Sequence, residues 1–308
     1  MDEIFDVMIL GAGAAGLTAG IYSSRAKHST LILNEGTVGG QMVLTNEIAN
    51  YPGVESTHGY TMANTMKKQA KEFGCKIKAN LKIQSYQLDN DIKTVTLEDG
   101  REFQGKSVIL APGGKPRPLN VPGEEEFKGK GISYCATCDG DFFQDKEIVV
   151  VGGGNSALEE AVSLTKYASK VTIIHQFDHF QAFAHAIEEA KNNPKINFIM
   201  ESEIREFHGS VGLEKVSIEN LSSREITELN TDGAFIFIGY VPNTESLKGK
   251  IKLNDRAEIP VDEDLMTNVA GVFAAGDCIP KKYRQVTTAV ADGTIAALGA
   301  SAYLRTTN

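Results

Sequence analysis

The sequence predicts an α/β fold, because strand-like and helix-like segments alternate and two glycine-rich turns each follow a strand and precede a helix. The first turn is GAGAAG, at residues 11–16, and the second is GGGNSA, at residues 152–157. Both have the G-x-G-x-x-G/A spacing of a dinucleotide-binding turn. We therefore expect two dinucleotide-binding (Rossmann-like) domains, the second inserted into the first.

The composition is typical of a water-soluble globular protein. A length of 308 residues predicts roughly two domains of about 100 to 200 residues each. Acidic residues outnumber basic ones by 40 to 31, and the net charge of −9 disfavours non-specific binding to nucleic acid or anionic membranes. The N-terminus is acidic, unlike a signal peptide, and no apolar run approaches the ~18 residues that span a bilayer. We expect a cytoplasmic protein without nucleic-acid or membrane partners.

The first βαβ unit is predicted at residues 5–34, where the strand patterns FDVMIL and STLILN flank the helix-like LTAGIYSSRAK. In its turn, Gly11 permits the tight bend, Gly13 lets the backbone approach a pyrophosphate, and Gly16 allows close packing of the helix, whose N-terminus attracts the anion. An acid about 20 residues further on would hold a ribose hydroxyl, and Glu35 has this position. The alternative is a turn with a structural role alone. The residues predicted to bind a dinucleotide here are Gly11, Gly13, Ala14, Ala15, Gly16 and Glu35.

Residues 81–113 are predicted to form antiparallel strands, because LKIQSYQLD, TVTLED, REFQG and SVILAPG alternate in polarity. The proline-rich KPRPLNVPG that follows is typical of a linker, and the chain is expected to cross back near residues 231–244. The predicted domains are one of residues 1–114 with 244–308, and an inserted one of residues 115–243.

A second βαβ unit is predicted from the strand KEIVVV, the helix LEEAVSLTKYAS and the strand KVTIIH, within residues 146–175. Its turn has Gly152, Gly154 and Ala157 in the fingerprint spacing, so it keeps the bend of the fold and has room for a pyrophosphate. This turn predicts the fold more strongly than it predicts a bound ligand.

Of four cysteines, Cys135 and Cys138 form a C-x-x-C motif in SYCATCDGDFF, whereas Cys75 and Cys278 stand alone. A structural zinc site normally needs four ligands, and the sequence has no second C-x-x-C or suitably spaced Cys/His pair. A redox dithiol in a reducing compartment is the better interpretation. Asp139 is either an acid–base partner of this dithiol or a turn residue. The two single cysteines are expected to be packed thiols.

His175 and His179 have the i, i+4 spacing that can place two metal ligands on one helical face. Residues 176–179 look like a loop after a strand, however, and no third ligand has a suitable spacing. We therefore predict solvated or hydrogen-bonded histidines and no metal site.

Several short motifs occur along the chain in the order GAGAAG, VGGQ, NYPG, CATCDG, GGGNSALEEA, FIGYVPNT, FAAGD and YRQ. In this order they resemble the low-molecular-weight thioredoxin reductases over nearly the whole chain, and CATCDG between two dinucleotide fingerprints is highly specific. The resemblance implies that residues 1–114 and 244–308 form an FAD-binding domain, that residues 115–243 carry the redox disulfide, and that the protein is a homodimer.

The same resemblance implies which residues contact FAD. Asp277 would bind the ribityl chain. The family usually has ATG where this chain has APG at residues 111–113, so this segment departs from the family at Pro112, next to Ala111. The residues that correspond to the family's FAD contacts, beyond the first turn, are Gly39, Gly40, Gln41, Asn50, Ala111, Gly276, Asp277, Tyr283, Arg284, Gln285 and Val286.

The resemblance also implies the chemistry of the motif. Reduced flavin passes two electrons to the disulfide, with Cys138 as the flavin-facing sulfur, and Cys135 then attacks the disulfide of thioredoxin or a thioredoxin-like protein. Asp139 corresponds to the acid of the family, which protonates either a leaving thiolate or the flavin adduct. Such exchange needs an attacking thiolate and a leaving group of matched pKa.

The expected electron donor depends on residues 175–182. NADPH-using members of the family have HRRxxFRA there, with arginines that hold the 2′-phosphate, whereas this chain has HQFDHFQA. Each charge-assisted bond lost at Gln176, Phe177 and Gln181 removes about 1.5 to 3 kcal/mol of binding free energy. An NADH site would have an acid at the end of the second strand, but the strand ends at His175 and Asp178 lies beyond it.

We therefore expect reduced ferredoxin, which delivers one electron at a time, as the favoured donor. The pattern resembles the ferredoxin-dependent flavin thioredoxin reductases of anaerobic bacteria, which keep the reductase fold but lack the pyridine-nucleotide motifs. One alternative is an NADPH-dependent thioredoxin reductase whose Lys or Arg residues reach the phosphate from elsewhere. A less favoured alternative is a non-catalytic flavin redox sensor or scaffold.

Overall fold

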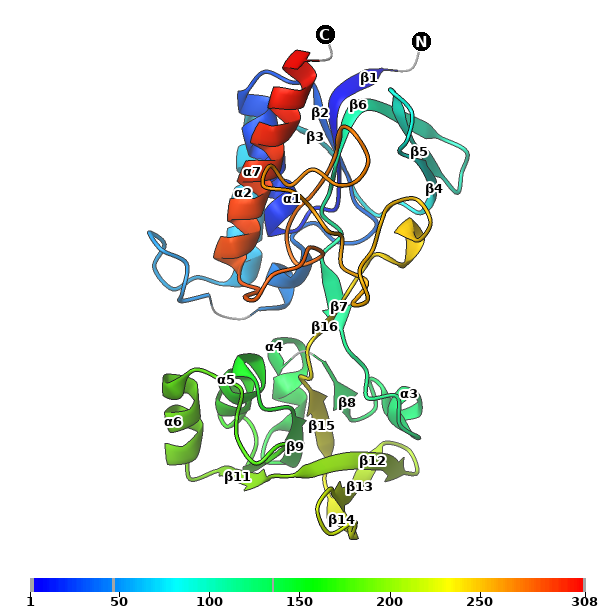
Figure 1. Cartoon of the computed structure of the whole chain (residues 1–308). Helices are drawn as coiled ribbons and strands as arrows, with labels where there is room; N and C mark the ends of the chain where they lie inside the picture. Colours follow the sequence, from blue (N-terminus) through cyan, green and yellow to red (C-terminus); the bar gives the residue numbers. More distant parts are fainter. Residues whose placement is uncertain (1–2, 46–47, 135, 307–308) are drawn as a thin grey trace. The chain divides into compact units, whose positions relative to one another are not determined.

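The computed structural model describes residues 3–45, 48–134 and 136–306. The chain divides into two compact units (Figure 1). The first unit comprises Met1–Lys115 and Val241–Asn308, and the second comprises Pro116–Tyr240. Short strands lie where the chain passes between the units, and these strands, β7 (Gly114–Pro116) and β16 (Tyr240–Pro242), pair with each other.

The first unit is built on a mixed sheet with the strand order β3-β2-β1-β6-β5-β4, and β17 pairs with β6. Strands β3, β2, β1, β6 and β17 are parallel, whereas β4, β5 and β6 pair antiparallel. The strands are β1 (Ile4–Leu10), β2 (Thr30–Leu33), β3 (Lys76–Lys78), β4 (Ile83–Gln87), β5 (Lys93–Leu97), β6 (Glu102–Leu110) and β17 (Val272–Ala274). The helices are α1 (Ala14–Arg25), α2 (Gly59–Glu72) and α7 (Val286–Thr306), with short 3-10 turns η1 (Gly40–Leu44) and η3 (Glu245–Leu247).

The central strands of this unit are covered on both faces, which explains their unbroken apolar sequences. Every residue of β2 is buried, and so are the last four residues of β1, as is usual for parallel strands between two layers. Helix α7 packs on α1 (Figure 1), and small residues allow the close approach. A Cβ on Gly293 would lie only 2.2 Å from the backbone oxygen of Ala15.

The second unit has a parallel sheet with the strand order β11-β10-β9-β15-β8. Its strands are β8 (Ile132–Ser133), β9 (Glu147–Val151), β10 (Lys170–Ile174), β11 (Ile196–Ile199) and β15 (Gly233–Ile236). A second, antiparallel sheet contains β12 (Ser202–Gly209), β13 (Leu213–Asn220) and β14 (Ile226–Asn230). The helices are α3 (Glu124–Phe127), α4 (Ala136–Asp139), α5 (Asn155–Leu164) and α6 (Ala184–Asn192), with the 3-10 turn η2 (Gly140–Phe143).

Strand β9 shows how this unit is layered. Ile148 and Val150 belong to the core under α5 and α6, whereas Val149 and Val151 belong to the core under the antiparallel sheet. Successive residues of a strand point to opposite faces. The run EIVVV is therefore apolar on both sides because both sides are buried.

The predicted α/β fold with two Rossmann-like domains is confirmed. The bounds of some elements differ from the prediction. REFQG and SVILAPG belong to a single strand, β6. Gly105 does not end the strand, because it lies beside β1, where a Cβ would come within 2.8 Å of the Met8 side chain. Helix α5 also begins at Asn155, before the predicted LEEA, because Gly154 is already the extended N-cap. What each unit binds stays a prediction.

Candidate active site

The first glycine turn packs against the end of β6. Gly11 has a φ of +110°, and a Cβ there would lie 2.1 Å from the oxygen of Ala111. A Cβ on Gly16 would lie 2.0 Å from the oxygen of Gly11. Only glycine fits such positions, so the turn that leads into α1, which begins at Ala14, packs closely against Ala111 through Gly11.

A second glycine pair approaches the same turn. The N–H of Gly39 donates to the oxygen of Ala12 (2.8 Å), and a Cβ on Gly40 would lie 3.0 Å from the Cα of Gly13. The two loops therefore meet backbone to backbone at Gly13 and Gly40. Exposed backbone and a helix N-terminus without a side-chain cap are what a pyrophosphate needs.

Residues from far along the sequence complete this region. A Cβ on Gly276 would lie 3.0 Å from the Cβ of Ala15. The side-chain amide of Asn50 donates to Gln285 Oε1 (3.1 Å), directly before Val286, the first residue of α7. Three segments that the sequence predicted separately, at residues 11–16, 39–50 and 276–286, are thus brought together.

Asp277 is the residue whose surroundings point most directly to a ligand. Its Oδ1 atom is buried without a hydrogen-bond partner among the described residues. Burial raises the pKa of this carboxyl, although Lys281 and Arg284 act in the opposite direction. A buried acceptor without a donor is costly, so a hydroxyl donor from a ligand would satisfy it. The ribityl chain of FAD carries such hydroxyls.

Arg284 and Gln41 hold the loops around Asp277 and the glycine pair. Arg284 forms an ion pair with the buried Glu258, and its Nε donates to the oxygen of Asp277 (3.5 Å). The Gln41 side chain donates to the oxygen of Gly114 (3.3 Å). Both side chains therefore bind protein groups, and these interactions fix the loops that they join.

Two further residues follow β2. Glu35, the predicted ribose acid, is exposed and accepts from the N–H of Ile83 (3.4 Å). Asn34, which the sequence argument missed, accepts from the N–H of Ala12 (2.9 Å) and so fixes the glycine turn from the neighbouring strand. The sequence feature that could have indicated this contact is the position of Asn34 directly before the predicted ribose acid, Glu35.

The redox motif is only partly described. Cys135 lies outside the described residues, and so does the side chain of Cys138, whose backbone is in α4. Asp139, the last residue of α4, accepts a hydrogen bond from the Ser133 hydroxyl (2.6 Å). The contact of Ser133 with Asp139 was not predictable from the sequence, because no periodicity marks a contact across the motif. The single thiols Cys75 and Cys278 are buried as predicted.

The second glycine turn is closed by the segment that follows β10. Gly152 has a φ of +132°. The His175 ring lies over Gly153, where a Cβ would be 2.4 Å from Nε2. The N–H of Gln181 donates to the oxygen of Gly153 (2.8 Å), and that of Phe183 donates to Asn155 Oδ1 (2.6 Å). The turn and the HQFDHFQA segment are therefore one structure.

The two histidines of this segment are satisfied by protein groups, as predicted. His175 is buried and its Nε2 lies 3.1 Å from the oxygen of His179, while His179 Nδ1 lies 2.6 Å from Asp178 Oδ1. Phe177 packs edge-on against the His175 ring. Within the described ranges, no group of three or more His, Cys, Asp or Glu side chains is arranged to hold a metal ion.

No Lys or Arg occupies the positions at which the family's NADPH-using members bind the 2′-phosphate. Gln176, Phe177 and Gln181 are all exposed, and the sequence has no Lys or Arg from His175 to Ala190. The local segment therefore offers aromatic and amide groups to a nucleotide and no guanidinium.

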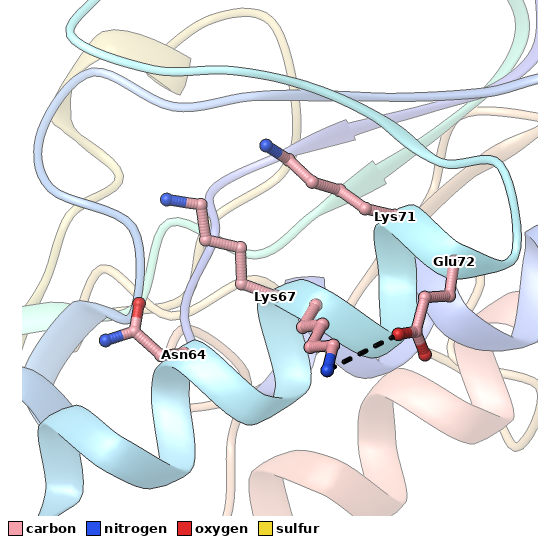
Figure 2. A pocket seen from close by; sticks show the side chains of 5 residues that line it. Asn64, Lys67, Lys71 and Glu72 are labelled. Atoms are coloured by element: carbon pink, nitrogen blue, oxygen red, sulfur yellow. Dashed lines mark ion pairs between the residues drawn. The ribbon is translucent and has the colours of Figure 1, made fainter.

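A basic groove of about 450 Å³ lies elsewhere, on α2. Figure 2 shows Lys67 and Lys71 extending toward the same side of the helix, beside Asn64. Lys68 forms an ion pair with Glu72 (3.8 Å). The groove contains none of the predicted site residues.

No described helix is long and apolar enough to cross a membrane.

Comparison with known proteins agrees with this arrangement. The profile of the pyridine nucleotide-disulphide oxidoreductases matches residues 5–293. A thioredoxin reductase of Peptoclostridium acidaminophilum is 47% identical over 99% of this chain and 98% of its own length. Lactococcus lactis thioredoxin reductase superposes with a TM-score of 0.95 at 39% identity, over 98% of this chain and 99% of that one. The chain therefore belongs to the pyridine nucleotide-disulphide oxidoreductases, and within them to the low-molecular-weight thioredoxin reductases, whose cofactor is FAD.

The expected ferredoxin-dependent subtype is not supported. A ferredoxin-flavin thioredoxin reductase of Clostridium acetobutylicum covers 99% of this chain and 100% of its own, but with 28% identity and a TM-score of 0.53. Both values are well below those of the Lactococcus lactis enzyme. The similarities favour the pyridine-nucleotide alternative instead.

Proposed function

We propose that the protein reduces thioredoxin with electrons from a pyridine nucleotide. The observation that carries this proposal is the CATCDG motif between two glycine turns. The first turn lies in the same region as Asp277, whose buried Oδ1 has no hydrogen-bond partner among the residues that the structure describes. FAD, when bound, takes two electrons from the donor and passes them to the disulfide. We assign FAD to the first unit and the dithiol to the second.

The chain's own residues then carry out a disulfide exchange. The Cys135 thiolate attacks one sulfur of the thioredoxin disulfide, and the other thioredoxin sulfur leaves as a thiolate that takes a proton from Asp139. The Cys138 thiolate next attacks Cys135, which closes the motif disulfide and releases the second thioredoxin sulfur. The second thioredoxin thiolate takes its proton from solvent. Thioredoxin thus gains two electrons from the motif, one proton from Asp139 and one proton from solvent.

Phe142 supports a protein acceptor. It lies on η2, four residues after Cys138, and is 76% exposed. A large exposed aromatic residue next to a reactive group is typical of a docking contact. We expect Phe142→Ala to raise the KM for thioredoxin several-fold and to leave the reduction of a small aromatic disulfide unchanged. Equal losses with both acceptors would count against docking at Phe142.

The donor follows from the second glycine turn. The turn keeps its backbone geometry and α5 has no side-chain N-cap, so a pyrophosphate can bind at the helix N-terminus. Without guanidinium groups at Gln176, Phe177 and Gln181, however, the 2′-phosphate of NADPH gains no charge-assisted bonds. We therefore infer that the enzyme has lost the preference for NADPH over NADH.

Reduced ferredoxin remains the second candidate. The absence of Lys and Arg from His175 to Ala190 is the observation that favours it, because a donor other than a nucleotide makes no demand on this segment. The N–H groups of Gln181 and Phe183 hold the HQFDHFQA segment against the second glycine turn. With ferredoxin as the donor, these hydrogen bonds would have a structural role only.

Anaerobic reduction of the FAD-loaded protein distinguishes these donors. The flavin absorbance is followed after mixing with NADH, NADPH or reduced ferredoxin, and thioredoxin thiols are then counted. We expect bleaching by both nucleotides, with NADH at least as effective. Bleaching by ferredoxin alone would replace the nucleotide proposal. Bleaching without thioredoxin reduction, with Cys138→Ser indistinguishable from the parent, would point to a redox sensor instead.

We also propose a cytoplasmic homodimer. Helices α1 and α7, which pack together, leave Tyr22, Ile295 and Leu298 exposed. Apolar side chains on neighbouring helices are typical of a surface that a second copy covers. The buried single thiols Cys75 and Cys278 agree with a reducing compartment.

A further inference from the structure

The hydrogen bond between Ser133 and Asp139 closes the redox motif into a loop. Ser133 is the last residue of β8 and Asp139 is the last residue of α4, so the bond joins the two ends of the segment 134–138, which contains both cysteines. The Ser133 Oγ donates to Asp139 Oδ2 over 2.6 Å. A hydroxyl that donates to a carboxylate forms one of the stronger hydrogen bonds in proteins.

Ser133 is a rigid base for this bond. It is buried, and its backbone is paired with Phe235 of β15 in the parallel sheet. Its position is therefore set by the sheet and does not depend on the loop that follows.

The other end of the loop is also fixed. Gly140, directly after Asp139, lies against the end of α5, where a Cβ would come within 3.2 Å of the Leu164 and Tyr167 side chains. The backbone of Asp139 is thus held by close packing. What packing leaves undetermined is the rotation of the carboxylate, and the hydroxyl of Ser133 determines it.

The bond leaves Asp139 chemically competent. A carboxyl group has two oxygens, and Ser133 engages Oδ2, so Oδ1 stays available to carry a proton. A side chain that can swing toward solvent delivers a proton to a given sulfur less often than one whose orientation is fixed.

We propose that Ser133 is a positioning residue that holds the Asp139 carboxyl in the orientation from which it protonates the leaving thiolate of thioredoxin. This inference rests on the proposed function, because it assigns a partner to the acid of that reaction. The proton passes from Asp139 to the thioredoxin sulfur as the Cys135–thioredoxin disulfide forms, and Asp139 regains a proton from solvent. Ser133 itself gives up no proton and stays a hydrogen-bond donor throughout.

The test measures the rate at which the fully reduced enzyme reduces thioredoxin, in the variants Ser133→Ala, Ser133→Thr, Asp139→Asn and Ser133→Ala with Asp139→Asn. Loss of one such hydrogen bond predicts a rate about tenfold lower in Ser133→Ala, with the KM for thioredoxin unchanged. Thr keeps a hydroxyl and should restore most of the rate. In the Asp139→Asn background, where the acid is already lost, Ser133→Ala should have no further effect.

Ser202→Ala is the matched control. Ser202 is buried in the same unit and donates to a backbone oxygen, that of Met200 (2.8 Å), so its loss removes a buried serine hydrogen bond away from the motif. An equal rate loss in Ser133→Ala with and without Asp139→Asn would overturn the proposal, as would a parent-like rate in Ser133→Ala. If the parent enzyme itself fails to reduce thioredoxin while its flavin is bleached by a donor, the proposed function fails, and the positioning proposal fails with it.

Discussion

The phenol of Tyr134 donates a hydrogen bond of 2.6 Å to the buried carboxylate of Glu124. The same carboxylate accepts from the N–H groups of Leu119 (2.9 Å) and Asn120 (2.6 Å). Burial and the Glu124 charge raise the pKa of Tyr134. Because Tyr134 directly precedes Cys135, a buried acid at the start of the second unit anchors the N-terminal flank of the redox motif.

The anchor predicts a loss of stability in Tyr134→Phe. The substitution keeps the ring but removes one donor from a buried carboxylate, which should lower the free energy of unfolding by about 1 to 3 kcal/mol. Thermal unfolding of the FAD-loaded protein measures this. Tyr167→Phe, a substitution in the same unit away from Glu124, serves as the control. Unchanged melting in Tyr134→Phe would mean that solvent replaces the phenol.

Asp277→Ala should weaken FAD binding. If the buried Oδ1 accepts a ribityl hydroxyl, loss of hydrogen bonds to a charged group worth about 1.5 to 3 kcal/mol predicts a Kd about 10- to 100-fold higher. The ratio of flavin to protein after gel filtration, followed by FAD titration of the apoprotein, gives the result. Asp255→Ala, at an exposed position of the same unit, should bind FAD like the parent. Full occupancy in Asp277→Ala would exclude that contact.

Arginine at positions 176, 177 and 181 should create a preference for NADPH. The three substitutions Gln176→Arg, Phe177→Arg and Gln181→Arg supply guanidinium groups to the 2′-phosphate, and two or three new contacts predict a gain of roughly two or more powers of ten. The gain should appear in kcat/KM for NADPH and not for NADH. Three lysines at the same positions test whether charge without the planar fork is sufficient. No change for either nucleotide would mean that this turn does not bind the donor.

Glu160 on α5 predicts a pH dependence of stability. Burial, assisted by the neighbouring Glu159, raises the pKa of Glu160 to about 7 from 4.5. The folded state therefore holds this proton more tightly than the unfolded chain, and stability is lost as the pH rises from about 4.5 through 7. At pH 8, the free energy of unfolding of Glu160→Gln should exceed that of the parent by up to about 3 kcal/mol. At pH 4.5, the two proteins should be equally stable.

The control for this prediction is Glu188→Gln, at an exposed position of α6. Differential scanning calorimetry of the parent, Glu160→Gln and Glu188→Gln across the pH range separates the effect of Glu160 from the effect of a changed net charge. A difference between Glu160→Gln and the parent that is constant with pH would contradict the linkage.

Leu298→Glu should separate the proposed dimer. Leu298 is 56% exposed on α7, and a charge in the centre of an apolar interface is not tolerated. Sedimentation of the FAD-loaded protein should show monomers. Val211→Glu is the matched control, because Val211 is an exposed apolar residue of the second unit. A monomeric parent, or a dimeric Leu298→Glu variant, would place the interface elsewhere or remove it.

The glycine positions were the most predictable part of the site, for a physical reason. Gly11 and Gly152 occupy left-handed conformations at points where a Cβ would collide with backbone, so the residue type itself records the geometry. The contacts of Ser133 with Asp139 and of Asn34 with Ala12 are not indicated by any comparable residue type in the sequence. Their partners are polar residues of common types, and only the folded chain brings them together.

The donor was the least predictable part. The absence of arginine at Gln176, Phe177 and Gln181 is a fact of the sequence, but it excludes one interaction and does not select a donor. The match of residues 5–293 to the pyridine nucleotide-disulphide oxidoreductases favours a nucleotide donor despite these three surface positions, because selectivity for the phosphate and the use of a nucleotide are separate properties. Strand β6 was predicted as two strands, REFQG and SVILAPG, whereas the chain is continuous through Gly105, which lies against Met8.

The packing of α7 on the first glycine turn has a consequence for biosynthesis. Gly293 touches Ala15, yet the ribosome makes α7 only after the whole of the second unit. The second unit can therefore fold while the proposed FAD region is still incomplete, and we expect FAD to be captured only late in translation. Nascent chains stalled before residue 286 should accordingly emerge with a folded disulfide unit and no flavin.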